Sequence, residues 1–364
     1  MTKTVQSHLS NMSGKDTDNN IQSSKFREKL LFLPKTEIHL HLEGIASVDS
    51  IWALWQKNNL FSADIQTKED LIRRFQITTL DEFIDLFINI IQNSFRTEDD
   101  FAYLINDAGE YLKNNNIVYS EIFFAPTKFL RMGFSFPKIV EILTEGAYSI
   151  HNRYGIEIKY LIDVSRTFGA ENAMNNLNLM LEYKSDAIIG IGLGGAEKLG
   201  PSKDYAEVFK KARKHGVHFV AHSGEDMGWK QIGETLIHLA PERLGHGISA
   251  IQNPKLVKYI AEKRIPLEIC PTSNLFTRKY VSEIETHPVK QFYENNLFVT
   301  INSDDPALFS TSLVDEYMLL FNKGIFSQNE ILALIKNNIY ASFLPEDKKN
   351  TLWRNCKTIC NSNR

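Results

Sequence analysis

The sequence has few cysteines and no excess of charge of either sign. Its three cysteines, Cys270, Cys356 and Cys360, make a poor disulfide framework and favour a reducing compartment. A formal net charge of -3 gives the chain no global basic field, so we expect no nucleic-acid partner. Because no apolar run approaches the roughly 18 residues of a membrane span, we expect no membrane association.

The N-terminal segment lacks the apolar stretch of a secretory signal. It is polar and rich in Ser, Asn, Asp and Lys, which predicts a disordered tail over residues 1–26. No low-complexity linker divides residues 27–364, so we expect one domain there. These features together predict a cytoplasmic protein and leave homo-oligomerisation open.

Short β-rich runs alternate with longer segments of helical apolar spacing along this domain. There are eight such runs, at residues 36–41, 117–124, 156–164, 187–193, 217–222, 243–248, 265–270 and 297–302. The alternation predicts an α/β fold, a (β/α)8 TIM barrel. An open doubly wound sheet is the alternative, but no glycine-rich dinucleotide fingerprint supports it. The long interval 42–116 predicts extra helices after the first strand, capping the barrel mouth.

Histidines and acids gather at the ends of four predicted strands, namely His39, His41, His222, Glu225, His246, Asp304 and Asp305. Each has an ordinary structural explanation alone, but a barrel brings the C-terminal ends of its strands around one mouth. Imidazoles with one carboxylate suit Zn²⁺, although other divalent metals tolerate the same donors. Groups left free for proton transfer then predict a hydrolytic site. The remaining histidines are expected to be structural or solvated: His8, His151, His215, His218, His238 and His287.

Six stretches resemble the adenosine deaminase family of amidohydrolase barrels: LPKTEIHLHLEG (33–44), GIGLGGAE (190–197), AHSGED (221–226), ERLGHG (242–247), LEICPTSN (267–274) and TINSDDP (300–306). The resemblance implies one Zn²⁺ per subunit, held by His39, His41, His222 and Asp304. It implies hydrolytic deamination at C6 of a 6-aminopurine nucleoside in purine metabolism. Adenosine, with 2'-deoxyadenosine, is the expected substrate, giving inosine and ammonia from adenosine. A single metal is expected, because AIIGIGLGG lacks the lysine that bridges two metals in binuclear relatives.

The same resemblance assigns a role to each remaining site residue. Glu225 would protonate N1 of the purine, and His246 would orient the attacking water and help to deprotonate it. Asp305 would hold N7 and orient the base. On the substrate side, Gly195 would meet N3 through its backbone, and Glu43 stands where the family often carries an Asp that meets the ribose.

Two departures from the family pattern leave the sugar-side substrate open. GLGGAE replaces the common DLAGDE, so Gly192 and Gly194 are expected to remove side chains near the purine, and Glu43 has a longer arm than Asp. The alternatives are 6-amino-6-deoxyfutalosine of menaquinone biosynthesis and free adenine, although ERLGHG resembles the nucleoside-acting branch. A substrate carboxylate would need a cation, and the candidates are Arg73, Arg74, Arg166 and Arg278. A catalytically silent purine-binding protein is a distant alternative, disfavoured by the intact ligand set.

Overall fold

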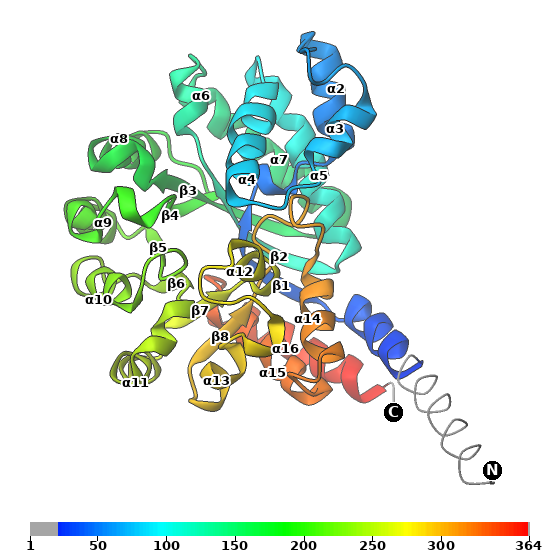
Figure 1. Ribbon diagram of the computed structural model, residues 1–364, viewed down its shortest axis with the longest axis vertical. Helices are drawn as coiled ribbons and strands as arrows, with labels where there is room; N and C mark the ends of the chain where they lie inside the picture. The colour runs from blue at the N-terminus through cyan, green and yellow to red at the C-terminus, as the bar shows by residue number, and fades with distance from the viewer. Residues whose placement is uncertain (1–20, 363–364) are drawn as a thin grey trace, which may run out of the picture.

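A computed structural model describes residues 21–362, and they form a (β/α)8 barrel (Figure 1). Its parallel strands follow chain order around the sheet: β1 Lys35–His41, β2 Ile117–Phe124, β3 Glu157–Ser165, β4 Ile188–Gly194, β5 His218–Ser223, β6 Arg243–His246, β7 Pro266–Ile269 and β8 Phe298–Ile301. Every strand begins within one residue of its predicted run. The predicted fold class is therefore confirmed.

The barrel closes between β1 and the segment that follows β8. Leu40 pairs with Asp304 in a parallel bridge. The backbone amide of His41 donates to the Asp304 carbonyl at 3.0 Å, and the Asp304 amide donates to the His39 carbonyl at 3.3 Å. Closure of the barrel therefore fixes the segment that carries Asp304 against the strand that carries the two histidines.

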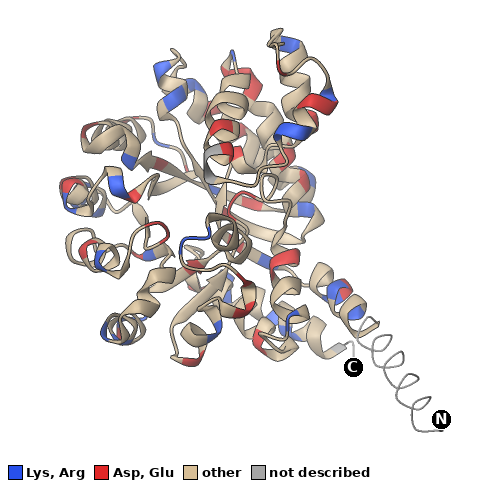
Figure 2. Cartoon of the chain, viewed as in Figure 1, with Lys and Arg blue, Asp and Glu red and all other residues tan. Residues whose placement is uncertain are grey.

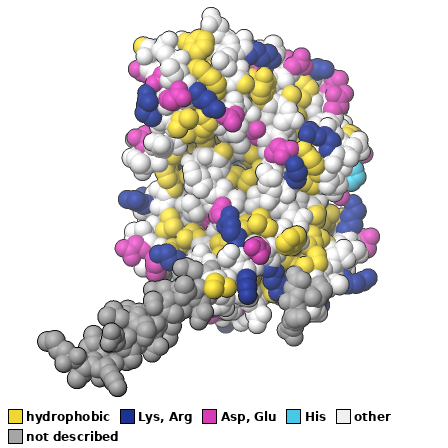
Figure 3. Space-filling model, turned by 90° about the vertical axis from the view of Figure 1, so that its right-hand side faces the viewer, with side chains coloured by type: hydrophobic (Ala, Val, Ile, Leu, Met, Phe, Trp, Pro, Cys, Tyr) yellow, Lys and Arg dark blue, Asp and Glu magenta, His cyan; other side chains and the backbone are white. Residues whose placement is uncertain are grey.

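Helices surround the strands and bury their outer faces (Figure 1). Those after β2 to β5 are α6 Thr127–Arg131, α7 Phe136–Tyr154, α8 Gly169–Glu182, α9 Ala206–Lys214 and α10 Trp229–His238. Those after β6 to β8 are α11 Pro254–Lys263, α12 Pro271–Thr277, α13 Val289–Glu294, α14 Leu313–Asn322, α15 Gln328–Ala341 and α16 Glu346–Ser362. Lys, Arg, Asp and Glu are interspersed on these helices (Figure 2), and the face in Figure 3 mixes charged with apolar side chains.

The β1–β2 interval holds the extra helices that the sequence predicts. They are α2 Val48–Asn58, α3 Lys68–Arg74, α4 Leu80–Asp85, a π-helical turn Leu86–Ile91 and α5 Phe101–Asn114. A capping box starts α4, because the Thr79 hydroxyl accepts from the Glu82 amide while the Glu82 carboxylate accepts from the Thr79 amide. Phe83 of α4 stacks on Phe309 with ring centroids 5.4 Å apart. This stacking joins α4 to the loop after β8, at the end of the barrel where the candidate site lies.

The N-terminal end departs from the sequence-based expectation. Of the expected disordered tail 1–26, residues 1–20 lie outside the described residues, but residues 21–32 are helical and Phe26 is buried. At the other end, Cys356 and Cys360 lie on α16. Between residues 21 and 362, no helix is long and apolar enough to cross a membrane. The expected cytoplasmic location stays a prediction.

Candidate metal and catalytic site

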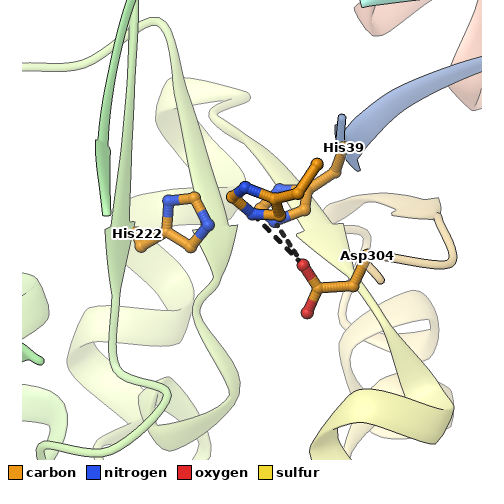
Figure 4. A group of neighbouring side chains, drawn as sticks. His39, His222 and Asp304 are labelled. Atoms are coloured by element: carbon orange, nitrogen blue, oxygen red, sulfur yellow. Dashed lines mark ion pairs between the residues drawn. The ribbon is translucent and has the colours of Figure 1, made fainter. Parts of the chain in front are cut away.

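Four of the predicted residues form a compact set of metal-ligand atoms at the barrel mouth. One atom from each of His39, His41, His222 and Asp304 lies within 4.8 Å of the others. Figure 4 shows the imidazoles converging beside the Asp304 carboxylate. Asp304 Oδ1 lies 3.4 Å from His39 Nε2 and 3.3 Å from His41 Nε2. The sequence predicted this grouping, and the structure places the residues together.

The outer nitrogens of two of these rings are held by acceptors, which orients the rings toward the centre. His39 Nδ1 lies 2.6 Å from Glu268 Oε2, and His222 Nδ1 lies 3.1 Å from the Leu193 carbonyl. A proton on each Nδ1 leaves Nε2 as a lone-pair donor, the arrangement that metal-bound histidines commonly show. His39 Nε2 is buried and makes no hydrogen bond among the described residues. This donor set fits a divalent cation such as Zn²⁺.

The backbone around the site is adapted to bring these side chains close. A Cβ on Gly245 would lie 2.9 Å from His39 Cε1 and 3.1 Å from His222 Cγ, so glycine leaves room for both rings. Asp304 and His246 have φ values of +66° and +57°, where side-chain-bearing residues are uncommon. Such strained positions cluster at functional sites.

Glu225 is the predicted proton donor, and its surroundings favour the protonated form. Burial raises its pKa well above the ordinary value, and the charges of Asp304 and Glu197 act in the same direction. About a quarter of its side chain, 26%, remains accessible. The Glu197 carboxylate fixes the loop that carries it, accepting hydrogen bonds from the amides of Gly224, Glu225 and Asp226.

His246 and Asp305 complete the predicted catalytic set. Burial lowers the pKa of His246 to about 4, so the imidazole is neutral at physiological pH. Burial, with the Asp304 charge beside it, raises the pKa of Asp305 to about 8. Asp305 Oδ1 is buried without a hydrogen-bond partner among the described residues, and a Cβ on Gly44 would collide with it. A neutral carboxyl there can donate a hydrogen bond.

Glu43 and Gly195 are the predicted substrate contacts. Glu43 is fully buried, and its Oε1 accepts from Gln92 Nε2 and the Ala125 amide, both at 3.3 Å. Glu43 Oε2 has no hydrogen-bond partner among the described residues. Gly195 has φ +79°, and a Cβ on it would collide with Ser165 Oγ. Glu43 therefore has an oxygen for which the described residues supply no donor, and the position of Gly195 has no room for a side chain; the substrate contacts of both stay predictions.

Gly192 and Gly194 carry no side chain, and neighbouring side chains occupy the space that a Cβ at either position would need. A Cβ on Gly192 would lie 2.5 Å from the Phe123 ring, and one on Gly194 would lie 3.0 Å from the Asp163 carboxylate. Side chains from β2 and β3 thus fill the volume that the two glycines vacate on β4. The sequence could not show that Phe123 and Asp163 fill this space, because that depends on which strands neighbour β4.

The four candidate arginines have different surroundings. Arg166 is buried and donates to the Gly200 carbonyl at 2.5 Å and to the His222 carbonyl at 3.0 Å, so it supports the fold. Arg73 and Arg74 are exposed and pair with Asp70 and Asp85 on the cap. Arg278 is exposed at the end of α12.

Sequence reasoning found the residues at the centre of the site but missed those that hold them. The missed residues are Glu197, Glu268, Asn274 and His287, of which His287 was expected to be structural or solvated, together with Asp163, whose carboxylate lies beside Gly194. Glu197, Glu268 and Asn274 lie inside the stretches that resemble the family. That position was an available signal, whereas nothing in the local sequence marked Asp163 or His287.

Comparisons with known proteins show the family of the chain. The profile of the family described as "Adenosine deaminase" matches residues 34–359. An adenine deaminase of Crocosphaera subtropica is 33% identical over 321 residues, covering 88% of this chain and 97% of that protein. An aminodeoxyfutalosine deaminase of Streptomyces coelicolor is 32% identical over 317 residues, covering 86% of this chain and 80% of that protein. The crystal structure of an adenine deaminase from Arthrobacter aurescens has a TM-score of 0.85 at 27% identity, covering 90% of this chain and 99% of that one.

The fold and these relatives define a hydrolase of the amidohydrolase class, built on a TIM barrel. Within that class, the chain belongs to the adenosine deaminase family. It is a deaminase of a 6-aminopurine-type substrate. The roles of the individual site residues stay predictions.

Proposed function

We propose that the chain deaminates a 6-aminopurine nucleoside, converting adenosine and 2'-deoxyadenosine to the C6-oxo nucleosides with release of ammonia. The observation that carries the proposal is the buried carboxylate of Glu43, whose Oε2 lacks a hydrogen-bond partner among the described residues. An unpaired buried carboxylate oxygen is costly, and a sugar hydroxyl would supply its missing donor. Free adenine has no such hydroxyl.

Three donors of this chain match the three acceptor nitrogens of an adenine ring. Burial raises the pKa of Glu225, which favours the protonated form, and that form would donate to N1 and make C6 electrophilic. Asp305, whose pKa is raised to about 8, would donate to N7. The Gly195 amide would donate to N3. A purine that lacked any one of these acceptors would leave a donor of the site unpaired.

The cation that fits His39, His41, His222 and Asp304 would lower the pKa of a water toward about 7 and polarise it for attack. The protein's own groups then act on substrate. Glu225 supplies the proton at N1, and His246 faces the attacking oxygen. Asp305 and Gly195 hold the purine ring in position. Ammonia leaves from the tetrahedral C6 centre.

Aminodeoxyfutalosine is the second candidate substrate. The Streptomyces coelicolor relative is an aminodeoxyfutalosine deaminase. Phe83, Phe276 and Phe309 pack together from three separate segments, with ring centroids between 5.1 and 6.3 Å apart. Such an aromatic cluster would suit a substrate that extends from the sugar with an aromatic group.

A comparison of four substrates tests the proposal. The kcat/KM of the zinc-loaded enzyme is measured on adenosine, 2'-deoxyadenosine, adenine and aminodeoxyfutalosine, for the parent, for Glu43→Gln and for the exposed control Glu69→Gln. We expect adenosine to be preferred over adenine. Loss of one charged hydrogen bond of about 1.5–3 kcal/mol should lower adenosine kcat/KM about 10- to 100-fold in Glu43→Gln and leave the value for adenine unchanged.

Other outcomes of this comparison would contradict the proposal in distinct ways. An equal loss of kcat/KM on adenosine and on adenine in Glu43→Gln would mean that Glu43 does not contact the sugar. If only aminodeoxyfutalosine were deaminated, the second candidate substrate would replace adenosine. If none of the four were deaminated, a silent purine-binding protein would replace the enzyme.

A further inference from the structure

Three buried polar side chains form a hydrogen-bonded row behind His246. Asn274, in α12, lies with Nδ2 3.1 Å from His246 Nδ1. His287, before α13, lies with Nε2 3.2 Å from Asn274 Oδ1. His246 and Asn274 are completely buried, and His287 is 3% exposed. Neither Asn274 nor His287 acts on substrate in the proposed deamination, and both contact the substrate side only through His246.

A backbone amide fixes which atoms donate and which accept in this row, beginning at its outer residue, His287. The Val289 N–H donates to His287 Nδ1 at 3.0 Å. A main-chain N–H can only donate, so His287 Nδ1 must be the unprotonated nitrogen. Burial lowers the pKa of His287 to about 3, which keeps the ring neutral. The single ring proton is therefore on Nε2, and it is donated to Asn274 Oδ1.

The orientation of the Asn274 side-chain amide then fixes which nitrogen of His246 is protonated. Because Asn274 Oδ1 accepts from His287, the amide must turn its NH₂ group toward His246. His246 Nδ1 accepts that hydrogen bond, so the proton of the neutral imidazole is on Nε2. His246 Nε2 has no hydrogen-bond partner among the described residues. Its nearest acidic atoms are Glu225 Oε2 at 3.5 Å and Asp304 Oδ2 at 3.9 Å, so it faces the reaction centre.

We propose that Asn274 and His287 are positioning residues that hold the proton of His246 on Nε2, aimed at the attacking oxygen. A protonated Nε2 donates a hydrogen bond to that oxygen and cannot take its proton. His246 therefore orients the water and stabilises negative charge as it develops. Once Glu225 has given its proton to N1, its carboxylate, with Oε2 3.5 Å from His246 Nε2, takes the proton lost by the water, and that proton leaves with the amino group as ammonia. This catalytic consequence rests on the proposed function, whereas the position of the His246 proton does not.

Asn274→Asp is the variant that separates this role from simple packing. It keeps the size of the side chain and the acceptor for His287 Nε2, but it replaces the NH₂ group with a second acceptor. A carboxylate oxygen facing His246 would draw the ring proton to Nδ1 and leave Nε2 bare. A side chain that merely filled space would leave the His246 proton where it was.

The position of the proton is read by long-range ¹H–¹⁵N spectra of the full-length, zinc-loaded protein with ¹⁵N-labelled histidine. His246→Gln assigns the signals. We expect Nε2 protonated in the parent, Nδ1 protonated in Asn274→Asp, and no change in Asn178→Asp, an exposed asparagine beside Lys211. A parent spectrum with Nδ1 protonated, or an Asn274→Asp spectrum like that of the parent, would overturn the proposal. The parent spectrum decides alone if Asn274→Asp does not fold.

Kinetics test the catalytic consequence with the same variant. We expect kcat of Asn274→Asp to fall about 10²- to 10³-fold, the range for loss of one hydrogen-bond donor to developing negative charge, at unchanged KM and zinc content. An inverted spectrum with unchanged kcat would overturn the donor role of His246. Absence of turnover in the parent would count against the proposed function only, because the spectra need no substrate.

Discussion

Replacing Glu268 by Gln should weaken metal binding while leaving the volume of this buried side chain almost unchanged. Glu268 is completely buried, with Oε2 2.6 Å from His39 Nδ1 and Oε1 2.5 Å from Arg243 Nε. Both neighbours are donors, whereas a glutamine offers only one acceptor atom. Its NH₂ group must therefore face one of them, and because the guanidinium of Arg243 has no acceptor, the glutamine oxygen stays on Arg243 Nε and His39 Nδ1 loses its acceptor.

Two independent estimates give the size of the effect. Loss of a buried hydrogen bond to a charged group costs about 1.5–3 kcal/mol. Loss of a residue that supports a metal-bound histidine typically weakens binding about 10- to 100-fold, which is about 1.4–2.8 kcal/mol. Because the two ranges overlap, we expect the zinc Kd of Glu268→Gln to rise by about one to two orders of magnitude.

Competition with a chromophoric chelator measures this change, and thermal unfolding of the metal-free protein checks the fold. The matched control is Glu242→Gln, which alters another histidine–glutamate pair, at 3.0 Å from His218 Nδ1 and away from the site. The control should bind zinc as tightly as the parent. If Glu268→Gln did so as well, His39 would not depend on Glu268 for its orientation, and the reasoning about the ligand set would be refuted.

Two further predictions concern metal removal and pH. A chelator that strips the four-ligand site should abolish ammonia release, and added Zn²⁺ should restore it; activity that survives complete metal removal would contradict the site. The pKa of His287 falls from 6.5 in the unfolded chain to about 3 on burial, so the unfolded state binds more protons between these values and stability drops as pH falls below 6.5. Between pH 7 and pH 5, the free energy of unfolding measured with urea should fall by about 2 kcal/mol more in the parent than in His287→Gln. Equal decreases in the two proteins would argue against a neutral buried His287.

The barrel and the centre of its site could be predicted because both follow from local pattern. Apolar runs separated by helical spacing set the eight strands, and the ligands stand at the ends of those runs. His39 and His41 share one face of β1 by the two-residue period of a strand. Once the strands close into a barrel, their ends must converge, so Asp304 meets both histidines although it lies far along the chain.

The residues that support the site could not be predicted in the same way. The contact of Asn274 with both His246 and His287 depends on how α12 and the segment before α13 pack, and no sequence period encodes that packing. The positive φ angles of His246 and Asp304 have no marker such as glycine. At the N-terminus, a polar composition led to Phe26 being assigned to a disordered tail, although Phe26 is buried, as are Leu30 and Leu33.

The central claim is that the cluster at the strand ends is a hydrolytic deamination site with Glu225 as its proton donor. The most direct test is ammonia release from adenosine and aminodeoxyfutalosine by the zinc-loaded parent and by Glu225→Gln, with zinc content measured in both. We predict that the parent releases ammonia and that Glu225→Gln retains zinc while kcat falls about 10²- to 10⁴-fold. A zinc-loaded Glu225→Gln as active as the parent would contradict the claim.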